Sequence, residues 1–572
     1  MAQNQAPDAD IIAPGQPVTV GTGLPRTDYV PITTTLANGD MAVVWRSAGS
    51  NPDSLENVNL QIVAPNGNPR TGVIIAGIAN GDTGSASNPD IAVLSNGRLV
   101  ITWDRLFDGS QNGIAARIFE PDGTPAGAQF QVNTAILASQ IGPKVTALAN
   151  GGFIVGWSDP SQGEGGATGD ADQNAVKAQY FDAAGARVGG EILVNTDTAA
   201  SQTLKAITTL ANGNVLLVWE GFAIPGIGLP GNSADIRAQI LSPTGGFVGG
   251  EFVVNANVAE TQRSPEAVAL ANGNFAILWK TGDFDAGFRV FDAAGTPLGS
   301  ETTIPTGISG IEGSADMVAL PNGNVVVTWP GVGPNRGSIV AQIFSPSGVK
   351  IGGELSVGPT ISSSAGAPPE IALLENGGFV IAWMTLTSTS TNKIVARTYD
   401  MGGVPQSAPF DVATNRGVLG EEGLTARLGG GFLIATSAGT LVFTSPAYNA
   451  FVEQPLNLKN TLFVSDADSA GGVETVTLSV SFGTLHLAAG TSGAMITGND
   501  TASVTINGTL AQIRALLGSD SQSIVQYIVG SSTPPASAAL TLSINDNGNG
   551  GTGGPLTASD VETITIKFDA AP

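Results

Sequence analysis

The sequence predicts an all-β protein: an eight-bladed β-propeller, with seven blades as the alternative, followed by a β-sandwich. The first observation is a repeated phrase of a Leu, an Asn-Gly turn and an apolar run ending in Trp, which occurs seven times at intervals of roughly 50–60 residues. The second is a composition with 77 Gly and only 12% charged residues, typical of a folded, turn-rich β protein. The third is the loss of the repeat after Ala447, where alternating strands with Gly, Asn and Asp turns follow.

Each repeat contains four short strand patterns in a constant order, most clearly between Lys144 and Thr196. The patterns are "KVTAL", "FIVGW", "AVKAQYF" and "EILVNT", and an Asn-Gly hairpin turn joins the first two. A four-stranded sheet cannot bury both of its faces alone, so the repeats are expected to stack as propeller blades. The Trp residues are then expected to fill the space between blades.

The two ends of the repeat region are incomplete. Residues 426–445 keep the hairpin but provide only three strands, and "APGQPVTVGTG" at residues 13–23 resembles an isolated fourth strand. Together they predict one blade made from both ends of the domain. The predicted domains are therefore a propeller at residues 1–446, closed by an N-terminal strand, and a sandwich at residues 447–572.

Composition excludes several classes of function. The net charge of −24 over 572 residues repels nucleic acid and anionic membrane surfaces, and no apolar run is long enough to span a membrane. There is no Cys, and His486 is the single His, so a nucleophile–His pair would depend on that residue alone. Acidic pairs beside Trp or Tyr do not recur, as a sugar cleft would require. The sequence therefore predicts no catalytic residues, no organic cofactor site and no enzymatic activity.

Acidic residues suggest a calcium site in the sandwich. Asp466 and Asp468 lie two residues apart in a loop rich in Ser and Gly, where both carboxylates can turn toward one Ca²⁺ ion. The alternative is that they cap a turn. Glu474 and Asp546 are weaker candidates. In the propeller, the loops after each Trp are also acidic and are expected to collect on one face: Asp104, Asp108, Asp159, Glu164, Asp170, Asp172, Glu220 and Asp235.

One loop of the propeller is unusually apolar. "GFAIPGIGLPGNS", at residues 221–233, is expected either to cover its own domain or to form a contact surface. The expected partners are accordingly a second copy of the chain, or a protein or glycan ligand at a cell surface.

The repeat and the C-terminal motifs together resemble modules of large RTX-type bacterial surface adhesins. The propeller repeat resembles that of hemolysin-type calcium-binding proteins, while "VSDADS", "FGTLHL" and "SVTINGTLAQIRALL" resemble cadherin-like domains. This resemblance implies further calcium ligands at Glu453 and Asp569. It also implies a non-enzymatic extracellular adhesin module, exported by a type I route, with the propeller as a recognition or assembly platform and a calcium-stiffened sandwich as spacer. The alternative is a carbohydrate-binding, lectin-like propeller.

Overall fold

The structure, a computed structural model, confirms an all-β fold. Its described part contains one short α-helix, α1 (Leu510–Arg514), which continues into the π-helical turn η3 (Ala515–Ser519). The described residues are 7–11, 17–19, 31–47, 57–64, 69–77, 86–106, 112–134, 138–160, 174–198, 201–222, 234–257, 260–282, 285–305, 315–331, 338–359, 369–374, 377–388, 391–414, 419–426, 431–436, 440–444, 449–452, 455–459, 461–466, 469, 471–520, 522–530, 533–549 and 554–567.

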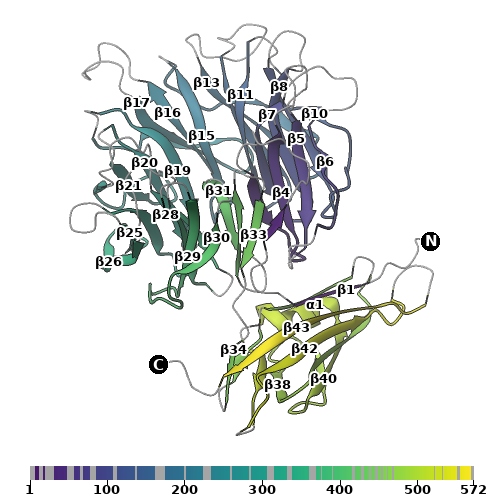
Figure 1. Cartoon of the computed structure of the whole chain (residues 1–572). Coiled ribbons are helices and arrows are strands. Elements are labelled where there is room, and N and C mark those ends of the chain that lie inside the picture. Colours follow the sequence, from purple (N-terminus) through teal and green to yellow (C-terminus); the bar gives the residue numbers. More distant parts are fainter. Residues whose placement is uncertain are drawn as a thin grey trace.

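The repeat region forms eight four-stranded antiparallel sheets that follow one another around a propeller (Figure 1). The first strand of each sheet is the inner one, because it contacts the first strands of neighbouring blades, and contacts between β3 and β31 close the circle. Blades one to four are β3 (Ile32–Thr35), β4 (Met41–Ser47), β5 (Asn57–Val63), β6 (Ile74–Ile75); β7 (Ala86–Val93), β8 (Leu99–Leu106), β9 (Asn112–Phe119), β10 (Phe130–Gln131); β11 (Ile141–Ala147), β12 (Phe153–Asp159), β13 (Ala175–Phe181), β14 (Arg187–Leu193); β15 (Gln202–Thr209), β16 (Val215–Phe222), β17 (Ala234–Leu241) and β18 (Phe247–Val253).

The eighth sheet combines both ends of the propeller sequence. Its strand order is β2-β33-β32-β31, and β2 pairs antiparallel with β33 through Pro17 opposite Val442. The fourth strand of this blade therefore comes from the N-terminal segment. Blades five to eight are β19 (Arg263–Ala269), β20 (Phe275–Lys280), β21 (Ala286–Phe291), β22 (Thr302–Ile304); β23 (Asp316–Ala319), β24 (Val325–Pro330), β25 (Ser338–Phe344), β26 (Lys350–Pro359); β27 (Glu370–Leu373), β28 (Phe379–Ser388), β29 (Thr391–Tyr399), β30 (Phe410–Thr414); β31 (Leu419–Ala426), β32 (Phe432–Thr436), β33 (Thr440–Thr444) and β2 (Pro17–Thr19).

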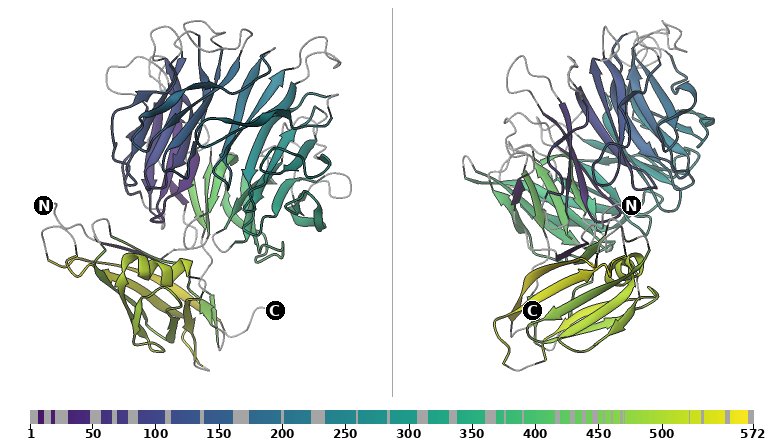
Figure 2. Two further views of the ribbon diagram at one scale, coloured as in Figure 1. Left: turned by 180° about the vertical axis from the view of Figure 1, so that it is seen from behind. Right: turned by 90° about the vertical axis from the view of Figure 1, so that its right-hand side faces the viewer.

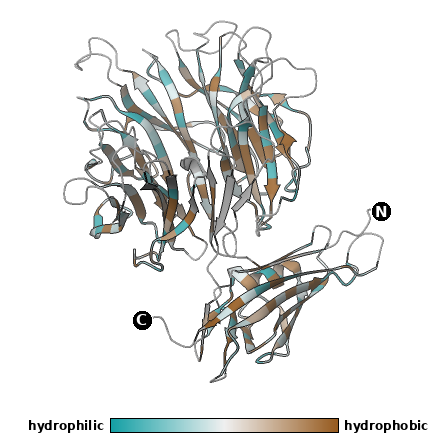
Figure 3. Cartoon of the chain, viewed as in Figure 1, coloured by the Kyte–Doolittle hydropathy of each residue, from teal (hydrophilic) through white to brown (hydrophobic). Residues whose placement is uncertain are grey.

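Apolar side chains pack between blades, as the repeat predicts, and Figure 3 shows their hydrophobic stretches along the strands. Trp103 of the second blade packs into one cluster with Val44 and Val58 of the first. Equivalent clusters recur around the propeller, which explains why the phrase ends in Trp. The seven Trp are all 3% exposed or less: Trp45, Trp103, Trp157, Trp219, Trp279, Trp329 and Trp383.

Polar residues of the repeat also join neighbouring blades. Glu191 accepts hydrogen bonds from the backbone N–H and the hydroxyl of Thr134, in the preceding blade, at 2.8 and 2.5 Å. Glu251 makes the same two contacts with Thr196, at 2.6 and 2.9 Å. The Glu of the "GGE" pattern and the Thr of the "VNT" pattern are therefore structural, because each pair holds one blade on the next.

The C-terminal domain has a six-stranded sheet and a three-stranded sheet around one apolar core. Its relation to cadherin-like domains stays a prediction. The six-stranded sheet has the order β34-β43-β42-β37-β40-β39, the three-stranded sheet has the order β35-β41-β38, and β36 lies outside both. Their bounds are β34 (Asn449–Phe451), β35 (Leu456–Asn457), β36 (Leu462–Ser465), β37 (Val473–Val480), β38 (Thr484–Ala488), β39 (Met495–Thr497), β40 (Ser503–Thr509), β41 (Ile524–Ile528), β42 (Ser537–Asn545) and β43 (Thr557–Lys567).

The division of the chain differs from residues 1–446 and 447–572 at one point. Strand β1 (Asp8–Ile11) belongs to the C-terminal domain, where it pairs antiparallel with β36 (Figure 2). Ala9 and Ile11 are 4% and 0% exposed within the core of that domain. The buried residues of this segment are apolar and alternate along the strand. Because β2 lies in the eighth blade, the N-terminal segment contributes one strand to each domain.

Candidate functional site

One position on the inner strands carries charged residues in several blades. This position, here called the ring position, pairs with the fourth residue of the second strand and so comes just after the partner of the Trp along the chain. Asp316 pairs with Thr328 and Glu370 with Ala382, for example. In blades one to seven the ring position holds Ile32, Asp90, Lys144, Ala206, Glu266, Asp316 and Glu370.

The ring position holds an acid in each of the adjacent blades six and seven, and one of these acids binds the backbone of the next blade. The backbone N–H of Ile371 donates to Oδ2 of Asp316 at 2.8 Å. This bond joins the Asp316 carboxylate of blade six to the backbone of β27 in blade seven, at the residue that follows Glu370. Glu370 is only 4% exposed. The arrangement combines two carboxylic acids on neighbouring strands, one of them nearly fully buried.

The same bond from a backbone N–H to an Asp side chain joins blades two and three, but the residue before the donor is different. The backbone N–H of Val145 donates to Oδ2 of Asp90 at 2.7 Å, and the residue before Val145 is Lys144. Asp90 is 8% exposed. The residue before the backbone donor is thus a base in blade three, whereas it is a second acid in blade seven.

Four of the acids that follow the Trp residues lie within the described residues, and all four are buried, so they do not form the acidic surface that the sequence suggested. Asp104 is 1% exposed and accepts from Gly142 N–H at 3.0 Å in the next blade, and Glu220 accepts from Ser264 N–H at 2.6 Å. Asp235 accepts from the side-chain amide of Asn255 at 2.9 Å. These residues hold strands in place. Asp108, Glu164, Asp170 and Asp172 lie outside the described residues.

Asp159 belongs to a buried ion-pair network. Lys177 Nζ lies 2.8 Å from Oδ2 of Asp159 and 3.2 Å from Oε1 of Glu191, and the Lys177 side chain is 1% exposed. Since Glu191 also binds Thr134 of the preceding blade, this network links strands β12, β13 and β14 to their neighbour. Opposite charges that satisfy one another in this way indicate a structural role.

Of the predicted calcium ligands, only Asp466 lies within the described residues. It is 8% exposed and directly follows β36, while Glu453, Asp468 and Asp569 lie outside the described part. Across the residues that the structure does describe, no group of three or more His, Asp or Glu side chains is placed to hold a metal.

Glu474 and Asp546 are brought together more closely than the sequence indicated. Thr475 pairs with Asn545 on antiparallel strands, so Glu474 and Asp546 are the next residues along the two strands. Both are 0% exposed, on the same side as the core residues Val476 and Ile544. Oδ1 of Asp546 accepts from the backbone N–H of Gly548 at 2.8 Å and of Leu556 at 2.7 Å. Two acids thus end the core-facing rows of β37 and β42.

Two further sequence expectations concern the surface. His486 is exposed, and its Nδ1 lies 2.6 Å from Oδ1 of Asp500, which fits a surface residue. In the apolar loop, Phe222 is 38% exposed, whereas Ile224, Ile227 and Leu229 lie outside the described residues. No helix among the residues described has the length and apolar character needed to span a membrane.

Comparison with known proteins finds no matching family model and no similar curated protein. Solved structures with a similar arrangement include the α-L-arabinanase of Penicillium chrysogenum complexed with arabinobiose, at 16% identity and a TM-score of 0.36, covering 61% of this chain and 100% of that one. The GH93 α-L-arabinofuranosidase of Fusarium graminearum matches at 12% identity and a TM-score of 0.38, covering 59% and 99%. The β-propeller domain of the trilobed protease of Pyrococcus furiosus matches at 11% identity and a TM-score of 0.35, covering 67% and 98%.

These comparisons contradict the prediction of a non-enzymatic adhesin module and the prediction that the chain is not an enzyme, because glycoside hydrolases are among the similar structures. At such identities and TM-scores, the likeness identifies neither substrate nor catalytic residues. The sequence reasoning looked for acids beside Trp and Tyr, whose side chains are committed to packing. The signal it missed is an acid four residues before the Leu of the repeated phrase, at Asp90, Glu266, Asp316 and Glu370.

Proposed function

We propose that the propeller is a carbohydrate-active enzyme that cleaves a glycosidic bond with Asp316 and Glu370. The observation that carries this proposal is the 2.8 Å bond from Ile371 N–H to Asp316, which fixes the Asp316 carboxylate on the inner strand that also carries Glu370. Hydrolysis of a glycoside needs such a pair, one acid to protonate the leaving oxygen and one carboxylate to activate water or attack the sugar.

The surroundings of the two acids suggest how the roles divide. Asp316 accepts backbone N–H bonds from Ile371 and from Met317, at 2.8 and 2.7 Å, and such bonds favour a carboxylate. Glu370 is 4% exposed, and burial is less costly for a neutral carboxylic acid than for a charged one. Glu370 therefore serves as the proton donor, and Asp316 as the carboxylate that acts on water or on the sugar.

The test is hydrolysis by the purified chain. Polysaccharides with different sugars are incubated with the protein, starting with arabinan and arabinobiose, and new reducing ends are measured. Asp316→Asn and Glu370→Gln keep the shape of the side chains. The amide oxygen introduced at position 316 can still accept from Ile371 N–H. Each is expected to lower the rate by about 10²- to 10⁴-fold.

Asp90→Asn is the matched control, since it alters the same ring position in a blade where the neighbour is Lys144. Its hydrolysis rate is expected to equal that of the parent. The proposal fails if no polysaccharide is cleaved, or if Asp90→Asn lowers the rate as much as Glu370→Gln does.

A second proposal concerns the C-terminal domain: we infer that it binds Ca²⁺ through Glu474 and Asp546. It is supported by the position of Glu474 and Asp546, which end adjacent strands, face the core and are 0% exposed. Carboxylate oxygens that converge from adjacent strands are the ligands that Ca²⁺ prefers. The extracellular location and export route inferred from resemblance to RTX-type proteins remain predictions, and they would supply calcium at the concentration that such sites need.

Calorimetric titration with Ca²⁺ tests the calcium proposal. Glu474→Gln is expected to abolish binding, whereas Glu562→Gln, on β43 of the same domain, leaves it unchanged. Absence of binding at about 1 mM Ca²⁺, the range typical of extracellular modules, would leave Glu474 and Asp546 as structural acids.

A further inference from the structure

The N-terminal strand β1 completes the C-terminal domain from more than 400 residues away in the sequence. All four of its residues pair in antiparallel register with β36, from Asp8 opposite Ser465 to Ile11 opposite Leu462. In the sheet arrangement, β36 has no other strand neighbour among the described residues. The backbone edge of β36 therefore depends on β1 for its hydrogen bonds.

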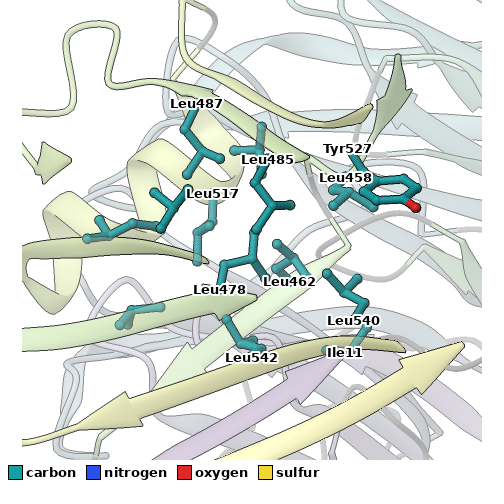
Figure 4. Close-up of a cluster of buried hydrophobic side chains, with 14 of the residues drawn as sticks. Ile11, Leu458, Leu462, Leu478, Leu485, Leu487, Leu517, Tyr527, Leu540 and Leu542 are labelled. Atoms are coloured by element: carbon teal, nitrogen blue, oxygen red, sulfur yellow. The ribbon is translucent and has the colours of Figure 1, made fainter. Parts of the chain in front are cut away.

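Side chains of the N-terminal segment fill the core of the C-terminal domain. Pro7, Ala9 and Ile11 are buried, with one residue between each pair, as expected for the inner face of a strand. Figure 4 shows Ile11 in the same cluster as Leu462 and Leu540. The segment thus acts as a ligand would, with a backbone edge and three apolar anchors.

A polar contact fixes the end of this segment. The backbone N–H of Ile11 donates to Oδ2 of Asp560, on β43, at 2.8 Å. Strand β1 also contacts β43 and β42, so it lies in a groove between β36 and the six-stranded sheet. The groove thus provides backbone acceptors and donors on one side, a carboxylate on the other and an apolar floor.

We propose that this groove is a strand-acceptor site for an extended segment with the pattern Pro-x-Ala-x-Ile, occupied here by residues 7–11 of the same chain. Recognition of an extended segment by an open strand edge combines main-chain hydrogen bonds with pockets for alternate side chains, and both are present. When the chain's own segment is absent, the site takes the same segment from a second copy of the chain. This site is independent of the proposed hydrolysis, because it involves none of the ring-position acids.

The site also ties the two domains together. Only residues 12–16 separate β1 from β2, which belongs to the eighth blade, and only residues 445–448 separate β33 from β34. Each extended residue spans at most about 3.6 Å, so both connections are short. The chain therefore passes twice between the domains, and an occupied acceptor site limits how far they can separate.

A variant that lacks residues 1–11 but keeps β2 tests the proposal. A synthetic peptide of residues 5–16 is added, and binding is measured by calorimetry and by thermal melting. The truncated chain is expected to bind one peptide and to regain the melting behaviour of the parent, whereas the parent does not bind because its site is filled. A peptide with Ile11→Asp is expected to bind about 10- to 100-fold more weakly, since it loses the buried apolar anchor.

The full-length Ile11→Asp chain provides a second variant in case truncation prevents folding of the C-terminal domain. It is expected to gain binding of the unmodified peptide, and a domain unfolded by either change is expected to refold when peptide is added. The proposal is wrong if neither variant binds or responds to peptide at about 1 mM, a typical effective concentration of a tethered segment. It is also wrong if the parent binds peptide as tightly as the variants do.

Discussion

Two pairs of residues occupy the same place in different parts of the propeller. In blades two and three, Asp90 binds the backbone N–H of Val145 at 2.7 Å and lies beside Lys144. In blades six and seven, Asp316 binds the backbone N–H of Ile371 at 2.8 Å, and the residue before Ile371 is Glu370. The backbone contact is the same, so it is part of how neighbouring blades are joined.

The difference between the pairs is the sign of one charge. An acid beside a base favours the folded state, whereas two acids side by side oppose their joint ionisation. The fold needs only the acid that binds the backbone, as Asp90 and Lys144 show, so this contact does not require an acid at position 370. An acid that a structural contact does not require is a candidate for function. This comparison is the reason to assign function to Asp316 and Glu370 rather than to the other ring-position residues.

The largest expected effect comes from removing the shared contact. Asp90→Ala and Asp316→Ala are each expected to lower the free energy of unfolding by about 1–3 kcal/mol, because a backbone N–H between blades loses its charged acceptor. Denaturant unfolding measures both values. A loss confined to one of the two variants would show that the pairs are not equivalent.

Reversing the charge in the third blade is expected to have a smaller effect. Lys144→Glu places a second acid beside Asp90 and imitates the pair in blades six and seven. The free energy of unfolding is expected to fall by about 1–2 kcal/mol, more than in the neutral control Lys144→Gln. If Lys144→Glu proves as stable as the control, like charges at this position cost nothing and the comparison loses its force.

The reciprocal change should give the smallest effect. Glu370→Lys places a base beside Asp316 and imitates the pair in blades two and three. It is expected to raise the free energy of unfolding by roughly 0.5–1 kcal/mol, measured in the same denaturant series. A decrease would mean that the fold has adapted to an acid at position 370.

Much of the propeller could be predicted from the sequence because its signals are local. The Asn-Gly turns define the hairpins, and the Trp that ends each phrase is buried between blades, as at Trp103 and Trp157. The strand β1 could not be predicted, because four residues with the pattern "DADI" contain too little information to identify a distant partner.

The candidate site was harder to predict than the fold. Asp316 and Glu370 are 54 residues apart, and their proximity depends on the register between neighbouring blades, which no local pattern encodes. The acids after the Trp residues were conspicuous in the sequence but hold strands together, as Asp104 and Glu220 do. In the C-terminal domain, the sequence ranks Glu474 and Asp546 below Asp466, because only the pairing of β37 with β42 brings them together.

The most direct measurement compares Glu370→Gln with the parent for both stability and hydrolysis, in the same preparation. We expect the free energy of unfolding to stay within about 0.5 kcal/mol of the parent value, because Gln keeps the shape of a neutral carboxylic acid, while hydrolysis falls by about 10²- to 10⁴-fold. Lost hydrolysis at unchanged stability would show that Glu370 serves activity rather than the fold. A variant that loses stability and keeps its hydrolysis rate would contradict the account, since Glu370 would then be a structural residue.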